Sequence, residues 1–196
     1  FWAIDKSSDA TFYGHYMDER GMKGGLEYRY YLDDWSKGTW MLDGFDDKRT
    51  DTGGQSSKDW GFEDGSTEIL RKNSDRYWLR GKVDQDLPWG ARSRLDLDIV
   101  SDQDYLTEFR DGRSGYNETR DYFLEAFGRD LDTYDENTRT NRLNVNRTWS
   151  RYSLNGDLRW NDNVTNRRWE ASDETLQQLP VIEFNGAKQQ AYGTGV

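Results

Sequence analysis

An alternation of apolar and polar residues with a period of two is the feature that most restricts the fold of this chain. It recurs in segments of roughly ten residues, a length typical of β-strands. In the clearest segment, residues 90–100, aliphatic side chains alternate with arginine and aspartate. Because successive side chains of a strand point to opposite faces, each segment predicts a strand with one apolar and one polar face. The other segments of this kind are residues 9–16, 22–31, 38–45, 75–86, 143–149, 151–160 and 181–185, the last of which can be extended towards Tyr192.

The connections between these segments predict an antiparallel meander. Short turns at residues 18–21, 87–90 and 150–151 join neighbouring segments, as in β-hairpins. Two joints are long, at residues 46–74 and 101–138, and loops of that size usually carry structure or function of their own. We therefore expect roughly seven or eight antiparallel strands in one curved sheet, each paired with its neighbour in sequence.

The second long joint contains signals for short helices. Residues 105–109 form one apolar turn after a serine and an aspartate, both of which are suitable N-caps. Farther along, Phe123, Phe127 and Leu131 recur with the spacing of one face of an amphipathic helix. We interpret this helix as a plug over one end of the sheet rather than as a binding site for a partner.

Composition narrows the classes of protein that this chain can belong to. Aromatic residues make up 15%, with 9 Trp and 12 Tyr, and disordered chains lack them. Hydrophobic and charged residues each make up 33%, which suits a sheet with one wet face or a membrane barrel with a polar interior. The net charge of -10 argues against nucleic acid as a partner. With 0 Cys, disulfides and thiolate metal sites are excluded.

No arrangement of residues predicts catalysis. His15 is the single histidine, so a metal cluster of several histidines is excluded, and nothing in the sequence predicts a triad around it. We interpret it as a wall residue of its strand. The aspartates at residues 96–98 and 102–104 are of a type that binds calcium. Alternating aspartates share one face of a strand, however, and we expect Arg92 and Arg94 to neutralise them. The sequence therefore predicts a protein that is not an enzyme and needs no cofactor or metal.

The excess of tryptophan and tyrosine has two interpretations. On a soluble sheet these side chains would form a platform on which sugar rings stack. On a membrane barrel they would form girdles at the level of the lipid headgroups. We favour girdles, because several tryptophans lie on predicted strands or at the turns beside them: Trp40, Trp78, Trp89, Trp149 and Trp160.

Three stretches of the chain, in order, are similar to motifs of one protein family. The first comprises residues 9–17, the Arg20-Gly21 turn and residues 25–30. The second comprises residues 76–78, a turn at Trp89-Gly90 and residues 96–106, where Val-Ser-Asp precedes Tyr-Leu; the third comprises residues 176–182, around Leu-Pro. Together they resemble the start of the barrel domain in the LptD family of lipopolysaccharide-assembly proteins, and the similarity spans nearly all of the chain.

One departure from the family pattern concerns proline. The family commonly has proline in its first two barrel strands, where it weakens pairing at a lateral opening. The matching segment here, residues 9–16, has none, and Gly14 is its only residue that would loosen the ladder. The first strand is represented only by residues 1–4.

The resemblance implies a large transmembrane β-barrel in the outer membrane of a Gram-negative bacterium. Residues 1–196 would be a fragment of its wall, an all-β, antiparallel up-and-down meander from a partial first strand to about the eighth. The lack of an initiator Met or signal peptide at Phe1 agrees with an internal piece. The implied function is insertion of lipopolysaccharide into the outer leaflet without covalent chemistry. The implied partners are lipopolysaccharide, the plug lipoprotein of the same complex and outer-membrane lipid; in the family a periplasmic jelly-roll domain feeds the barrel.

The resemblance and the alternation together predict three sets of residues. We expect the lateral gate at Phe1, Trp2, Ile4, Ala10, Phe12, Gly14 and Tyr16. We expect a lumen-facing polar wall of Arg80, Lys82, Arg92, Arg94, Asp96, Asp98, Asp157 and Arg159. The lipid-facing side should carry Leu79, Val83, Leu95, Leu97, Ile99, Leu154 and Leu158.

Two other functions stay open at this point. The first alternative is a soluble carbohydrate-binding β-sandwich that uses the aromatic platform, and the second is an adhesin-like structural fragment. A sandwich requires two sheets packed face to face over a common core, whereas a barrel wall is a single sheet. The number of sheets therefore distinguishes the barrel wall from the sandwich.

Overall fold

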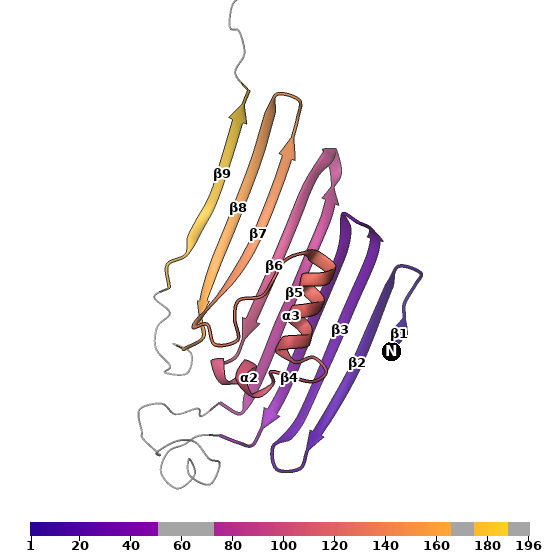
Figure 1. Cartoon of the computed structure of the whole chain (residues 1–196), viewed down its shortest axis with the longest axis vertical. Helices are drawn as coiled ribbons and strands as arrows, with labels where there is room; N and C mark the ends of the chain where they lie inside the picture. Colours follow the sequence, from indigo (N-terminus) through magenta and orange to yellow (C-terminus); the bar gives the residue numbers. More distant parts are fainter. Residues whose placement is uncertain (51–72, 166–174, 188–196) are drawn as a thin grey trace, which may run out of the picture.

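The chain folds into one sheet of nine strands that carries two helices on one of its faces (Figure 1). This computed structural model describes residues 1–50, 73–165 and 175–187. The strands are β1 (Trp2–Ala3), β2 (Ser8–Met17), β3 (Gly21–Asp33), β4 (Ser36–Asp47), β5 (Asp75–Leu87), β6 (Ala91–Val100), β7 (Thr138–Thr148), β8 (Tyr152–Asn163) and β9 (Gln178–Gly186). A 3-10 turn, η1 (Pro88–Gly90), joins β5 to β6, and α2 (Gln103–Glu108) and α3 (Tyr116–Phe127) lie between β6 and β7.

The predicted antiparallel meander is confirmed. The strands lie side by side in sequence order, and every neighbouring pair is antiparallel. The sheet has nine strands rather than seven or eight, because the two-residue β1 and the strand β9 both pair with their neighbours. The described residues form this one open sheet and contain no second sheet packed against it, as a sandwich would require. The extension of the last strand towards Tyr192 lies outside the described residues.

The alternation predicted from the sequence separates the two faces of the sheet. On one face a row of apolar side chains crosses strands β2 to β6, and its members are Phe12, Leu26, Leu42, Leu79 and Ile99. On the other face a parallel row consists of Asp9, Arg29, Thr39, Lys82 and Asp96. We call these the aliphatic face and the charged face.

Both helices lie on the charged face, and they form with it the only buried apolar cluster that the described residues contain (Figure 1). Asp102 caps α2, since its side chain accepts a hydrogen bond of 2.9 Å from the backbone nitrogen of Tyr105. Tyr105, Leu106 and Phe123 are buried against the sheet. The predicted helix is thus present, but it covers the middle of the charged face rather than plugging an end of the sheet. We call residues 101–137 the insert.

The aliphatic face, in contrast, is left uncovered by the described residues. Phe12 is 62% exposed and Leu42 is 45% exposed, although both lie within long strands. Trp78 and Arg76 on the charged face are fully buried. The fold therefore buries its charges and exposes its aliphatic side chains, the reverse of an ordinary soluble sheet. None of the described helices is long and apolar enough to cross a membrane.

The ladder between β6 and β7 is shorter than the strands themselves. It runs from the pair Ala91–Arg147 to the pair Asp96–Arg142 and then stops. Beyond that point the side-chain oxygen of Asn141 accepts a hydrogen bond of 2.8 Å from the backbone nitrogen of Asp98. Side chains thus replace backbone pairing where the insert leaves and rejoins the sheet.

Candidate functional site

A cluster of five charged side chains fastens the start of the insert to the charged face. We call Arg20, Asp47, Arg76, Asp102 and Glu108 the latch cluster. The guanidinium of Arg76 lies 2.9 Å from Asp47, 2.7 Å from Asp102 and 2.8 Å from Glu108. Arg20 adds contacts of 2.6 Å to Glu108 and 2.5 Å to Asp47. The cluster joins the β2–β3 turn, β4, β5 and α2.

Glu108, the last residue of α2, contributes a titratable carboxyl to the latch cluster. Burial raises the pKa of its carboxyl, but the charge and hydrogen bonds of Arg76, with those of Arg20, outweigh burial and lower the pKa below its ordinary value of 4.5. A lowered pKa in the folded state gives stability that is complete above the unfolded value. That stability is lost as the pH falls through the folded value.

We expect acid to release α2 from the sheet. Between pH 7 and pH 4.5 the contacts of Glu108 should hold, and below 4.5 they should weaken as the carboxyl becomes protonated. Glu108→Gln should remove on the order of 1–3 kcal/mol at pH 7 and flatten the acid dependence. Hydrogen exchange of the α2 amides across this pH range measures the effect. Glu118→Gln, at an exposed glutamate of α3, is the control; equal pH profiles for both variants would contradict the expectation.

Two more ionic groups hold the end of the insert. Asp96 lies 2.9 Å from both Lys82 and Arg129, and Arg129 continues at 2.6 Å to Asp84. Asp98 accepts a hydrogen bond of 2.8 Å from the indole of Trp78, and Arg139 pairs with the same carboxylate. Lys82 and Arg129 thus neutralise Asp96, and Arg139, which also donates a hydrogen bond of 3.0 Å to the backbone oxygen of Asp132 in the insert, neutralises Asp98.

The expected ion pairs are present, but the expected partners were wrong. Arg92 pairs with Asp86 at 3.0 Å, and the nearest carboxylate to Arg94 is that of Asp84, at 3.6 Å. Neither neutralises Asp96 or Asp98. The reason is that neighbouring strands supply the charges: Lys82 of β5 lies opposite Asp96 and pairs with it, and Arg139 reaches Asp98 from β7.

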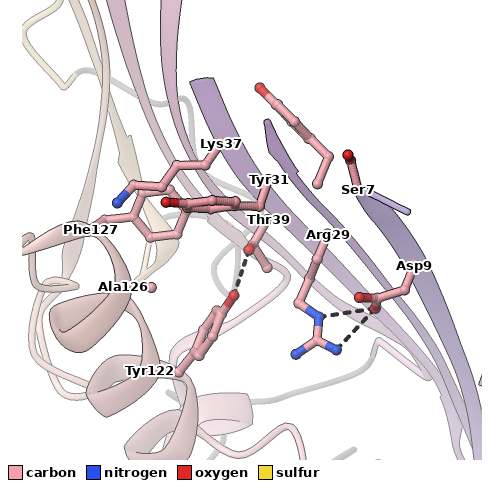
Figure 2. Close-up of a pocket in the computed structure, with 10 residues that line it drawn as sticks. Ser7, Asp9, Arg29, Tyr31, Lys37, Thr39, Tyr122, Ala126 and Phe127 are labelled. Atoms are coloured by element: carbon pink, nitrogen blue, oxygen red, sulfur yellow. Dashed lines mark hydrogen bonds and ion pairs between the residues drawn. The ribbon is translucent and has the colours of Figure 1, made fainter. Parts of the chain in front are cut away.

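A groove separates the second half of α3 from strands β2 to β4 (Figure 2). Its volume is about 290 Å³, and both walls contribute polar and aromatic side chains. The hydroxyls of Tyr122 and Thr39 share a hydrogen bond of 2.8 Å across its floor. Tyr31 and Phe127 line it with aromatic rings. The groove is thus a mixed polar and aromatic site, open to solvent.

Two cations face this groove. Arg29 binds Asp9 through Nε and Nη2, each at 3.0 Å, and its third guanidinium nitrogen points into the groove (Figure 2). The Nζ of Lys37 lies 5.6 Å from the ring centroid of Phe127. Among residues 1–50, 73–165 and 175–187, none gives Lys37 an ion-pair partner within 4.0 Å. The groove therefore offers nitrogen donors that the described protein groups leave available.

No protein-family model matches the chain, and no curated protein matches it. The candidate site is therefore defined by its geometry alone.

The residues expected in the polar wall all lie on the charged face, but in three different surroundings. Arg80, Lys82 and Asp98 are buried beneath the insert, and Asp96 is half-buried beside them. Arg92 and Arg94 are exposed near the short turns. Asp157 and Arg159 lie apart on β8, where Asp157 contacts Arg159 at 2.8 Å and Arg142 at 2.5 Å.

The residues expected at the lateral gate lie at the β1–β2 edge of the sheet. β1 pairs with β2 only through Trp2–Ala10 and Ala3–Asp9, whereas β2 pairs with β3 from Ser8 to Met17. Phe1 and Ile4 flank β1 and are exposed, while Ala10, Phe12, Gly14 and Tyr16 share the aliphatic face of β2. Gly14 lies opposite Gly24, so two glycines meet at this point of the ladder. The gate itself stays a prediction.

One tryptophan was assigned to the wrong environment. Trp78 is fully buried beneath the insert, because it shares the charged face with Arg76 and Arg80. It cannot belong to a girdle. Trp89 and Trp149 lie in or beside short turns, with 83% and 37% of their surfaces exposed, in positions compatible with a girdle.

Proposed function

We propose that this chain forms part of the wall of an outer-membrane barrel that inserts lipopolysaccharide into the outer leaflet. The observation that carries the proposal is the inverted sheet: the charged face is packed against the insert, while the aliphatic face has no protein partner among the described residues. In water, such an exposed aliphatic surface promotes aggregation. In a membrane, lipid is its natural solvent, and the polar face lines the lumen.

Strand length agrees with the proposal. A barrel strand that crosses the hydrocarbon layer at a tilt of about 45° needs about 9–11 residues. β2 and β6 have 10 residues each, β7 has 11, and β9 has 9. β3 and β5, with 13 each, are long enough to extend past the layer.

The distribution of aromatic side chains also favours a membrane. At the end of the sheet that carries the β5–β6 and β7–β8 turns, Trp149 and Tyr152 are exposed, and the ring of Tyr152 stacks on Phe184 with centroids 5.5 Å apart. Near the opposite end, Tyr16 and Tyr77 are 64% and 39% exposed. Between these two groups the rows are aliphatic on β5 and β6, with Leu79, Val83, Leu97 and Ile99, whereas on β2 to β4 they also contain Phe12, Tyr28 and Trp40. Two aromatic belts that flank an aliphatic band are typical of a transmembrane barrel.

Three parts of the proposal rest on the three LptD-like stretches. They are lipopolysaccharide as the cargo, the plug lipoprotein as a partner and the Gram-negative outer membrane as the location. The part of the charged face that the insert leaves uncovered suits passage of sugars, and the weakly paired β1–β2 edge suits the lateral exit of acyl chains. The proposed role is transport, not catalysis, and it involves no cofactor. The carbohydrate-binding sandwich is disfavoured, because the described strands form a single sheet.

Photo-crosslinking at two adjacent positions of β8 tests the proposal. Ser153 lies on the charged face and Leu154 on the aliphatic face, so each is a matched control for the other. In the full-length protein in outer membranes, a photoreactive residue at 153 should capture lipopolysaccharide. One at 154 should capture phospholipid or acyl chains. Capture of soluble proteins at 154, or no lipopolysaccharide at 153, would argue against the proposed transport.

A further inference from the structure

We propose that the groove between α3 and strands β2 to β4 is a binding subsite for an anionic sugar, one ring that carries a phosphate. This inference rests on the proposed function for the identity of the cargo, and it adds a defined place where the cargo's head group is held during passage. The groove lies on the charged face, which would line the lumen (Figure 2).

The cationic side chains that line the groove favour an anion as its ligand. Lys37 has no carboxylate within ion-pair distance among the described residues, and Arg29 directs its third nitrogen into the groove. The other two nitrogens of Arg29 are held by Asp9, and its Nε also lies 3.4 Å from Glu27, so the guanidinium is fixed in orientation. Of the two cations, Lys37 is therefore the one without a carboxylate partner in the part of the chain that the structure describes. A phosphate group would accept a hydrogen bond from Lys37 or from the third nitrogen of Arg29, and such charge-assisted hydrogen bonds are stronger than neutral ones.

The aromatic and hydroxyl side chains of the groove favour a sugar over a bare ion as the ligand. Tyr31 and Phe127 present rings beside Lys37, and aromatic faces pack against the apolar face of a sugar ring. The hydroxyls of Tyr122 and Thr39 both donate and accept, as sugar hydroxyls require. A volume of about 290 Å³ is at the small end of ligand sites, which suits one ring with its phosphate.

The position of the groove gives the subsite a role in transport. Its sheet wall consists of β2, β3 and β4, and Ser7 of the β1–β2 turn lies at its margin. These strands form the edge where the lateral gate is proposed. A head group held here would be placed beside the exit for the acyl chains of the same molecule. The groove would therefore orient lipopolysaccharide on the lumen side of the gate.

Binding to the full-length protein in detergent tests the subsite. The probes are the deacylated, phosphorylated core oligosaccharide of lipopolysaccharide, the same oligosaccharide after phosphatase treatment, and inorganic phosphate. Lys37→Gln should weaken binding of the phosphorylated probe about tenfold, the loss expected for one charge-assisted contact. Ala126→Trp, which fills the groove from α3, should abolish binding of both oligosaccharides. Lys48→Gln, at an exposed lysine after β4, is the matched control and should change nothing.

The outcomes separate this inference from the proposed function. Thermal unfolding of each variant checks that it is folded. If the protein inserts lipopolysaccharide into vesicles but Lys37→Gln and Ala126→Trp bind the probes like the parent, the subsite is wrong and the transport function stands. If the probe binds in a Lys37-dependent manner but no insertion occurs, the transport function is wrong and the subsite stands. Equal binding of inorganic phosphate and the phosphorylated sugar would overturn the assignment of a sugar.

Discussion

Leu42→Arg is expected to destabilise the protein in a membrane by about 2–4 kcal/mol, the cost of arginine near the bilayer midplane. Leu42 lies at the centre of the aliphatic row, between Leu26 on β3 and Leu79 on β5. On a face exposed to water the same substitution would change stability by less than about 0.5 kcal/mol, because Leu42 is already 45% exposed. The effect therefore distinguishes lipid from water as the solvent of this face.

The measurement is the unfolding free energy of the full-length protein in lipid vesicles, together with its yield in outer membranes. Leu32→Arg is the control, since Leu32 lies near the end of β3, in the register shift between Tyr31 and Asp33, and is 63% exposed. At that depth arginine should cost at most about 1 kcal/mol. Equal, small effects at both positions would show that this face does not contact lipid.

Arg76→Met should cost about 3–5 kcal/mol, since it leaves buried carboxylates without their main partner. Arg76 is fully buried and contacts Asp47, Asp102 and Glu108, whereas Arg20 reaches only Asp47 and Glu108. Asp102 also caps α2, so the start of the insert should loosen with it. Unfolding by guanidinium measures the loss of free energy, and limited proteolysis within the insert measures its release.

Arg120→Met is the comparison for this variant. Arg120 pairs with Asp121 at 2.7 Å on α3, where the two side chains are 39% and 66% exposed. Exposed pairs contribute about 0–1 kcal/mol, so this change should be nearly neutral. Similar losses for the two variants would indicate that the latch cluster does not hold the insert.

The strands, their order in the sheet and the N-cap of α2 could be predicted from the sequence, because each depends on a local pattern of residues. Period-two alternation locates a strand whatever its neighbours are, and Asp102 caps α2 through a contact three residues away. The environment of Trp78 could also have been predicted. It shares its parity with Arg76 and Arg80, which places it on the charged face whatever its residue type favours.

The ion pairs could not be assigned in the same way, because they depend on register and on the path of the insert. Sequence proximity suggested Arg92 and Arg94 as partners for the aspartates of β6. The observed partners of Asp96 and Asp98 are Lys82, Arg129 and Arg139, which lie 14, 33 and 41 positions away. The groove was missed for the same reason, since Tyr122 meets Thr39 across a separation of 83 positions.

The end of α3 is set by a glycine, which the periodicity of apolar residues does not reveal. Phe123, Phe127 and Leu131 have helical spacing, but α3 ends at Phe127, because Gly128 adopts a left-handed conformation with φ of 65°. Leu131 still joins the buried cluster from the segment that follows. The apolar pattern therefore identified the buried side chains correctly, although not the end of the helix.

The position of the insert has a consequence for the order of folding. Most of the buried apolar cluster comes from β4 to β6 and from the insert that directly follows β6. Contacts between segments close in sequence form faster than distant ones, because less chain entropy is lost in closing the loop. The β5–β6 hairpin and the helices can thus collapse together in water before the rest of the sheet is assembled. That early nucleus would bury the arginines and aspartates of β4 to β6 first, so the aliphatic face, the surface proposed to meet lipid, would be presented only after the charges are already paired.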